Sequence, residues 1–273
     1  MNTNSSMNSD STTPWIGKVP QHWSSMRLKD CVDGCVNGIW GDDPKGDDTD
    51  TPVIRVADFD RLKRSTFPHE TTRSVGDDQR RSRVLLPGDL LIEKSGGGEL
   101  QPVGMVVEYK GVDGAVCSNF VARMRPREFV DSRYLTFLHA HMYACGVTTI
   151  SIKQSTGIQN LDSNSYLTER CHLPPLKEQL QISSYLDKET KRIDSLIEGK
   201  NQLLKNLDQL FDSAITEAVT FGLDPNVQRR SEPEHSLFNF PSHWLRCGLI
   251  KKIESIVDYR GKTPEKTDSG VFL

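Results

Sequence analysis

Residues 173–221 read LPPLKEQLQISSYLDKETKRIDSLIEGKNQLLKNLDQLFDSAITEAVTF, and this stretch decides the organisation of the chain. After the pair Pro174-Pro175 it contains no proline and only one glycine, Gly199. Because proline and glycine are the residues least compatible with a helix interior, one uninterrupted helix is predicted over residues 176–221. A glycine and then a proline follow within a few positions, which is a normal way for a helix to end.

A mostly apolar ladder runs along this predicted helix in alternating steps of four and three residues. A period of about 3.5 residues is typical of a coiled-coil seam. About 44 residues make a rod of about 66 Å, which is too long to bury its stripe against one small domain, so a partner helix is predicted. The alternative is a long amphipathic helix packed on its own domain. The predicted coiled-coil interface consists of Ile182, Leu186, Ile193, Leu196, Leu203, Leu207, Leu210 and Ala214, and the polar members of the ladder are Glu189, Lys200 and Glu217.

The residues before the helix have a different texture, with short apolar bursts separated by Gly, Pro and Asp. Such bursts are strand candidates at spacings typical of a compact β-rich domain. One stretch, Ser132–Tyr143, has apolar residues at helical spacing and predicts a helix. We therefore expect an α+β domain here. Its strand candidates are Val53–Val56, Val84–Leu86, Leu90–Ile92, Val103–Val107 and Phe120–Met124.

A short motif occurs twice, once on each side of the predicted helix. Val19-Pro20-Gln21-His22-Trp23 stands near the start, and Phe240-Pro241-Ser242-His243-Trp244 stands 221 positions later. The match indicates an internal repeat; the alternative is a coincidental turn with a packing tryptophan. The predicted order is a disordered tail (1–14), a β-rich domain (15–172), a coiled-coil helical spacer (173–222), a linker (223–239) and the incomplete start of a second copy of the domain (240–273).

The totals set only weak limits on function. The chain has 273 residues, a net charge of −3 and a pI of about 6.2, so nothing global indicates a nucleic-acid binder. A local basic face would still suffice for that. Six cysteines are spread without a dense framework, which favours free thiols in a reducing cytoplasm. Because neither a signal segment nor an apolar run of about 18 residues is found, a soluble cytoplasmic protein is expected.

Several further segments follow one another in a characteristic order. They are Glu93–Gly98 (EKSGGG), Cys117–Phe120 (CSNF), Ser155–Leu161 (STGIQNL) and Leu173–Gln179 (LPPLKEQ) with the helix after it. Together with the repeated His-Trp motif, they resemble the specificity subunits of type I restriction–modification enzymes. The resemblance covers almost the whole chain after residue 15.

This resemblance implies two target-recognition domains, each reading half of a split DNA site, and an antiparallel coiled coil that fixes their separation. It implies docking of two adenine methyltransferase (modification) subunits, which use S-adenosylmethionine, so no cofactor is expected in this chain. A restriction/translocase subunit can join such a complex. Since Leu273 falls early in the second copy, the chain is expected to be an incomplete product or a half-subunit that restores the symmetry as a homodimer.

Double-stranded DNA is then the expected ligand, and reading it requires positive charge and donors near base edges. Residues 61–83 form a basic island, for which phosphate contact is favoured over a merely solvated face. Residues 94–98 form a glycine-rich loop that could approach the DNA backbone. Residues 153–156 carry a cation, an amide and two hydroxyls; the alternative there is a loop that packs the domain on the helix. The predicted DNA-binding residues are Arg61, Lys63, Arg64, Arg73, Arg80, Arg81, Arg83, Lys94, Ser95, Lys153, Gln154, Ser155 and Thr156.

No catalytic or metal site is predicted, and the chain is expected not to be an enzyme. Asp89, Glu93 and Lys94 faintly resemble a metal-dependent nuclease pattern, but the last two are neighbours on a strand and would point to opposite faces. The candidate zinc ligands His139, His141 and Cys145 have poor spacing and no fourth member, so structural roles are favoured for them.

A rival hypothesis belongs to another class of protein. It is an interaction protein in which a β-rich ligand-binding domain sits on an oligomerising coiled coil and does not bind DNA. The near-neutral total charge and the acidic stretch Asp42–Asp50 are its best support. A salt-sensitive, sequence-selective interaction with DNA distinguishes the two hypotheses.

Overall fold

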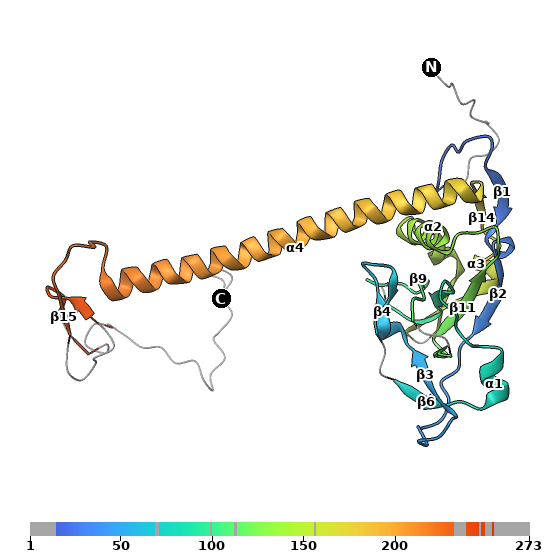
Figure 1. The fold of residues 1–273 in the computed structure, drawn as a ribbon, viewed down its shortest axis with the longest axis horizontal. Helices are drawn as coiled ribbons and strands as arrows, with labels where there is room; N and C mark the ends of the chain where they lie inside the picture. The colour runs from blue at the N-terminus through green and yellow to red at the C-terminus, as the bar shows by residue number, and fades with distance from the viewer. Residues whose placement is uncertain are drawn as a thin grey trace, which may run out of the picture. The chain divides into compact units, whose positions relative to one another are not determined.

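The computed structural model describes residues 15–68, 71–98, 100–111, 114–155, 157–231, 239–245, 247–248 and 253. The chain divides into two compact units, Met1–Arg192 and Ile193–Leu273. Helix α4 (Leu176–Phe221) contributes residues to both units (Figure 1). It begins directly after the proline pair, as predicted. It ends at Gly222, whose φ of +79° is a left-handed conformation that favours glycine.

The first unit is built around a six-stranded mixed sheet with the order β2-β11-β7-β9-β5-β4. Neighbouring strands are antiparallel except β5 and β9, which are parallel. Helix α2 (Ser132–Ala144) packs against β9. The strands are β2 (Val32–Asn37), β4 (Phe59–Asp60), β5 (Ser65–Thr66), β7 (Leu90–Glu93), β9 (Val106–Glu108) and β11 (Val121–Pro126).

Both faces of this sheet are covered at β7. Leu90 and Ile92 belong to one hydrophobic core, whereas Leu91, between them, belongs to a second core. Successive strand residues point to opposite faces, so a continuous apolar run is what a strand buried on both sides needs. Leu135 and Met142 of α2 lie in the first core.

The described residues also form smaller sheets. They are β1-β14, β10-β3-β6 and β12-β13-β8 in the first unit, and β15-β16 in the second. Their strands are β1 (Ser24–Arg27), β3 (Asp50–Ile54), β6 (Thr72–Ser74), β8 (Ser95–Gly96), β10 (Val116–Cys117), β12 (Ile152–Ser155), β13 (Ile158–Leu161), β14 (Arg170–Leu173), β15 (Arg229–Ser231) and β16 (Asn239–Pro241). The short helices are α1 (Asp77–Arg81) and α3 (Ser163–Tyr166), with 3₁₀ turns η1 (Leu28–Asp30), η2 (Val56–Asp58) and η3 (Val147–Ser151).

The structure confirms the α+β fold with a long helix, but one strand candidate was wrong. Residues 84–86 form no strand. The Leu85 N–H donates to the Ala115 carbonyl, and the Val84 carbonyl accepts from the side chains of Arg123 and Arg125. Because these partners satisfy the backbone groups, the segment needs no neighbouring strand. Observed strands overlap the other four candidates, and α2 coincides with the predicted helix.

A buried glutamine attaches the start of α4 to the domain. Gln179 has no exposed surface. Its Oε1 accepts from the Asp131 N–H at 2.8 Å, and its Nε2 donates to the carbonyls of Phe129 at 3.1 Å and Pro174 at 2.8 Å. Asp131 is the N-cap of α2. One side chain therefore joins the start of α4 to the start of α2.

The first copy of the repeated motif is attached to the same turn of α4. Glu178 accepts a hydrogen bond from Trp23 Nε1 at 3.1 Å, and its other carboxylate oxygen lies 2.8 Å from His22 Nε2. The Trp23 N–H also donates to the Pro20 carbonyl at 3.1 Å. The first copy is thus an anchored turn.

The second copy of the motif makes the same backbone turn. The Trp244 N–H donates to the Pro241 carbonyl at 3.0 Å. Within the second unit, this tryptophan lies close to Gly222, because a Cβ added to that glycine would be 3.5 Å from the indole ring. The boundaries of the predicted domains at residues 172 and 240 stay predictions. Much of the predicted second copy lies outside the described residues.

The predicted coiled-coil seam behaves differently along its length. Ile182 is half-buried against the first core. Leu186 is half-buried. The remaining seam residues are all exposed, namely Ile193, Leu196, Leu203, Leu207, Leu210 and Ala214. For these the partner helix stays a prediction. Within the described part of the chain, no helix combines the length and apolarity that crossing a membrane requires.

Two neighbouring histidines of α2 have separate structural contacts. His139 is buried, and its Nδ1 lies 2.7 Å from the Tyr166 hydroxyl. His141 Nε2 lies 3.0 Å from the carbonyl oxygen of Trp15. Burial lowers the pKa of His139 to about 3, so the ring is neutral at physiological pH.

Replacing Gln179 with leucine should destabilise the protein strongly. Gln179→Leu removes the partner of the Asp131 N–H and of two carbonyls, and we expect a loss of about 2–5 kcal/mol in the free energy of unfolding. Urea denaturation measures it. Gln181→Leu, an exposed position on the same helix, is the control and should change stability by less than about 0.5 kcal/mol. Equal effects of the two substitutions would contradict the assigned role.

His139 should make stability depend on pH in the acidic range. Its pKa is about 3 in the folded chain against an ordinary value of 6.5, so between these values the unfolded state binds a proton that the folded state does not. The free energy of unfolding should therefore fall as the pH drops below 6.5, by up to about 1.4 kcal/mol per pH unit. His139→Gln should flatten this slope, whereas removal of the exposed His141 as His141→Gln should not. An unchanged slope in His139→Gln would disprove this origin.

Candidate nucleic-acid interface

Two segments predicted to contact DNA meet in the small sheet β12-β13-β8. Lys153 and Ser95 stand opposite Asn160 on its two sides. Directly opposed residues share one face of a sheet, so these three side chains form a row. Ser95 Oγ donates to Asn160 Oδ1 at 2.6 Å. The sequence analysis missed Asn160, although it lies within the quoted segment 155–161.

Lys153 reaches out of this row toward solvent. Its side chain is 78% exposed and its ammonium lies 2.7 Å from Asp162 Oδ2. The hydrogen bond from Lys153 lowers the pKa of Asp162, helped by the backbone N–H of Ser165. A lysine ammonium has three donors, so further acceptors can bind beside Asp162.

The predicted loops at these positions are strands instead. Pairing with β13 supplies the backbone hydrogen bonds that turn Ser95–Gly96 and Ile152–Ser155 into β8 and β12. Gln154 stands opposite Gln159, so it lies on the face away from Lys153. Ser155 is described only by its backbone, and Thr156 lies outside the described residues.

Lys94 and Arg83 meet at Asn37, the last residue of β2. Lys94 Nζ donates to Asn37 Oδ1 at 2.5 Å, and Arg83 Nε donates to the Asn37 carbonyl at 3.1 Å. Arg83 also donates to the Gln79 carbonyl at 2.9 Å. The structure thus brings together two predicted phosphate contacts from different parts of the sequence.

Arg61 is partly buried and pairs with a buried carboxylate. Its Nη2 donates to Glu93 Oε2 at 3.0 Å, and the Glu93 side chain is only 3% exposed. In the amide orientation that satisfies both groups, the Gln101 oxygen also accepts from this guanidinium. Burial raises the pKa of Glu93, and the charge and hydrogen bond of Arg61 oppose that rise. Arg61 is therefore better suited to stabilising a buried carboxylate than to contacting DNA.

The remaining cations of the island lie beside carboxylates or aromatic rings. Arg73 pairs with Asp43 and lies over the Trp40 ring, 4.5 Å from its centroid. Arg64, which has a φ of +53°, lies 5.7 Å from the centroid of Phe137. The other pairs are Lys63 with Asp60 at 4.0 Å, Arg80 with Asp77 at 2.9 Å and Arg81 with Asp78 at 3.7 Å. The cations of the island therefore have different partners.

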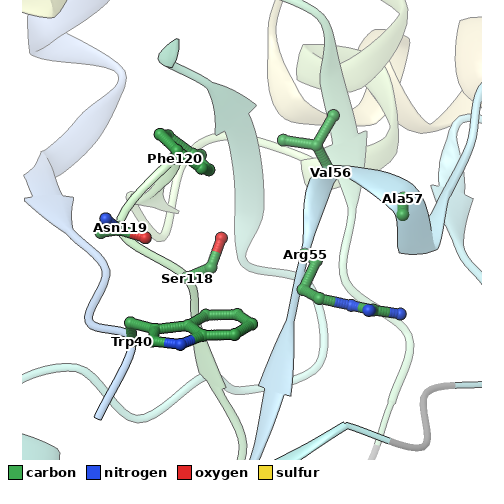
Figure 2. Close-up of a pocket in the computed structure, with 7 residues that line it drawn as sticks. All are labelled: Trp40, Arg55, Val56, Ala57, Ser118, Asn119 and Phe120. Carbon is green, nitrogen blue, oxygen red and sulfur yellow. The ribbon is translucent and has the colours of Figure 1, made fainter. Parts of the chain in front are cut away.

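A cavity of about 400 Å³ lies beside these cations (Figure 2). It is lined by Trp40 after β2, by η2 and by residues 118–120 before β11. Phe120 was predicted to lie in a strand, but it comes just before the strand β11. Its side chain has 51% of its surface exposed. Sequence reasoning missed this cavity, although CSNF had been singled out as a motif.

The residues with a faint nuclease pattern do not converge. Asp89 accepts from Arg125 at 2.7 Å, and this bond raises the pKa of the arginine. Glu93 is bonded to Arg61, whereas Lys94 is bonded to Asn37. Within the part of the chain that the structure describes, no group of three or more His, Cys, Asp or Glu side chains is arranged to hold a metal ion.

Comparisons with known proteins agree on one family. Residues 20–206 match the family model of the type I restriction modification DNA specificity domain. A protein of Methanocaldococcus jannaschii named as a specificity subunit of the type I restriction enzyme MjaX is 21% identical over 231 residues, which cover 84% of this chain and 52% of the relative.

Two solved structures share the fold. A chain from a study of complex assembly and conformational transition of the type I R-M system has a TM-score of 0.55 at 21% identity, covering 77% of this chain and 49% of its own. The HsdS subunit from Thermoanaerobacter tengcongensis has a TM-score of 0.51 at 19% identity, covering 78% of this chain and 47% of its own. The chain spans about half the length of these relatives. Since the family match runs from the first His-Trp turn through the β-rich domain into α4, the chain belongs to the type I restriction modification DNA specificity domain family.

Proposed function

We propose that this chain is a non-catalytic DNA sequence-specificity subunit that directs an adenine methyltransferase, and a restriction complex built on it, to a split DNA site. The observation that carries the proposal is the family match over residues 20–206, which spans the β-rich domain and the first part of α4. The curated relative in this comparison is itself named as a specificity subunit.

The row formed by Lys153, Asn160 and Ser95 supports contact with DNA. Lys153 is largely exposed beside one carboxylate, so it can bind a phosphate. The exposed Asn160 keeps its amide NH₂ group while its oxygen accepts from Ser95. Side-chain amides suit the edge of adenine in the major groove. A cation beside a base-reading amide is the combination that recognition of DNA requires.

The near-neutral charge of the chain does not oppose this proposal. Several of the acids that pair with the island are exposed, for example Asp43 and Asp78 with side chains 93% and 95% exposed. Exposed ion pairs contribute little to stability, between about 0 and 1 kcal/mol. Arg73 and Arg81 can therefore exchange these carboxylates for phosphates at low cost.

The exposed part of α4 supports a partner helix. From Ile193 to Leu210 its seam residues lie in solvent at the heptad spacing of a coiled coil. We assign this stretch to a second helix, either from a longer chain or from a second copy of this chain in a homodimer. The paired helices would set the distance between the two DNA half-sites.

In this proposal the partner subunits, and not this chain, carry out the chemical reactions. The adenine methyltransferase subunits dock on the chain, bind S-adenosylmethionine and extrude the target adenine from the duplex. A restriction/translocase subunit joins the same complex.

The function can be tested by mapping methylated adenines across the genome of cells that express the methyltransferase, with and without this chain. A split motif that depends on the chain is expected. A palindromic motif would identify a dimer of two copies, whereas two different half-sites would identify a longer chain. No chain-dependent motif and no salt-sensitive binding of DNA would favour the rival interaction protein.

The lysines of the interface should contribute to affinity without selecting the sequence. Lys94→Ala and Lys153→Ala should each lower the slope of log Kobs against log salt concentration by about 0.9, because each removes one phosphate contact. The preferred motif should not change. Lys188→Ala, at an exposed position of α4, is the matched control. Fluorescence anisotropy with labelled duplexes gives these slopes, and slopes equal to that of the control would remove both lysines from the interface.

A further inference from the structure

We infer that the cavity beside Trp40 and Phe120 binds one unpaired nucleobase of the DNA. This inference rests on the proposed DNA-binding function and deepens it, since it assigns a base-binding pocket to the recognition domain itself. The cavity, of about 400 Å³, falls within the size range of small-molecule sites. Its walls combine aromatic and aliphatic side chains with a few polar groups.

A buried hydroxyl without a partner points to a ligand. Ser118 is 1% exposed, and its Oγ has no hydrogen-bond partner among the described residues. Figure 2 shows this hydroxyl directed into the space bordered by Phe120 and Val56. A buried polar group that remains unpaired is unfavourable. The edge of a nucleobase carries both donors and acceptors and can satisfy it.

The aromatic walls are held in place by the backbone. Gly38 N–H donates to the Val121 carbonyl at 3.0 Å, and the next N–H, of Ile39, donates to the Cys117 carbonyl at 2.8 Å. A Cβ at Gly38 would lie 2.2 Å from the Ser118 carbonyl oxygen, so only glycine permits this close approach. The approach brings Trp40 to the side of Ser118.

Phe120 is anchored in the same way while its ring remains accessible. Its carbonyl accepts from the N–H groups of Lys94 at 2.8 Å and Ser95 at 3.2 Å. The exposed ring is thereby fixed next to two predicted DNA contacts. Aromatic rings on rigid backbone are platforms on which bases stack.

Positive charge lies on both sides of the cavity. The Arg73 guanidinium lies over the Trp40 ring, and Lys94 follows the strand β7 next to Phe120. Arg55, at the mouth, is oriented by two hydrogen bonds to Asp58, at 3.0 and 3.2 Å. Cations on both sides of the cavity suit the phosphates on either side of a nucleotide whose base occupies it.

The aromatic walls of the cavity suit an unpaired base better than a paired one. A base inside a duplex presents only its edge, whereas stacking on Trp40 or Phe120 requires its face. Extrusion of an adenine by a methyltransferase breaks a base pair, so the proposed complex creates unpaired bases. An aromatic side chain of a protein would satisfy the rings but not the surrounding cations.

The test uses the full chain and a short duplex that carries one bulged 2-aminopurine, at low salt, with a fully paired duplex for comparison. Stacking on tryptophan quenches the fluorescence of this base. We expect wild type to quench the bulged base and to prefer the bulged duplex. Trp40→Ala should abolish the quenching, and Trp40→Ala and Phe120→Ala should each weaken binding of the bulged duplex on the order of tenfold. Phe129→Ala, which removes a ring 46% exposed outside the cavity, should behave as wild type.

Ser118→Ala separates binding from folding. Because the hydroxyl has no described partner, its removal should leave the melting temperature unchanged and weaken binding of the bulged duplex only. A lower melting temperature with unchanged binding would overturn the role of Ser118. Binding of both duplexes without quenching, or with quenching that survives Trp40→Ala, would overturn the pocket and leave DNA binding intact. No salt-sensitive binding of either duplex would overturn both the pocket and the proposed function.

Discussion

The buried amide of Gln179 is the contact on which the arrangement of the first unit depends. This side chain accepts a hydrogen bond from one backbone N–H and donates hydrogen bonds to two carbonyls. These backbone groups belong to the segment before α2 and to the proline pair before α4. Without this amide those backbone groups would lose their side-chain partner. Glu178 beside it anchors the first His-Trp turn, and Asp187 pairs with Arg133 of α2 at 2.7 Å. Through these contacts the first turns of α4 are part of the domain.

The two ends of α4 are marked by the same motif. The turn at Pro20–Trp23 is attached to its first residues through Glu178, and the equivalent turn at Pro241–Trp244 lies close to Gly222 after its last residue. The repetition of one backbone turn at both ends fits a family whose curated relative is about twice as long as this chain. An exposed heptad seam between these ends is unfavourable in water, which gives α4 a reason to pair.

Charge and aromatic surface are organised separately in the recognition domain. One cation of the island pairs with the buried Glu93, and others form exposed ion pairs. A third set of cations lies near Asn37 and Trp40. That last group borders the cavity that contains the unpartnered Ser118 hydroxyl. In the proposed function, electrostatic attraction positions the backbone of a nucleic acid while the cavity offers stacking and hydrogen bonds to a base. The two functions use different side chains of one neighbourhood.

The sequence by itself determined the features that depend on local pattern. Helix α4 followed from heptad spacing without proline, α2 from helical spacing and β7 from an apolar run, because each period is written in consecutive residues. The family followed from motifs in order. Only the tertiary structure decided which residues meet. Ser95 bonds to Asn160 across 65 positions, and Trp40 reaches Ser118 because Gly38 allows it. Pairing at such distances turned predicted loops into β8 and β12 and withdrew Arg61 from the surface toward Glu93. This pairing depends on backbone and side-chain partners far away in the sequence, which no local pattern encodes.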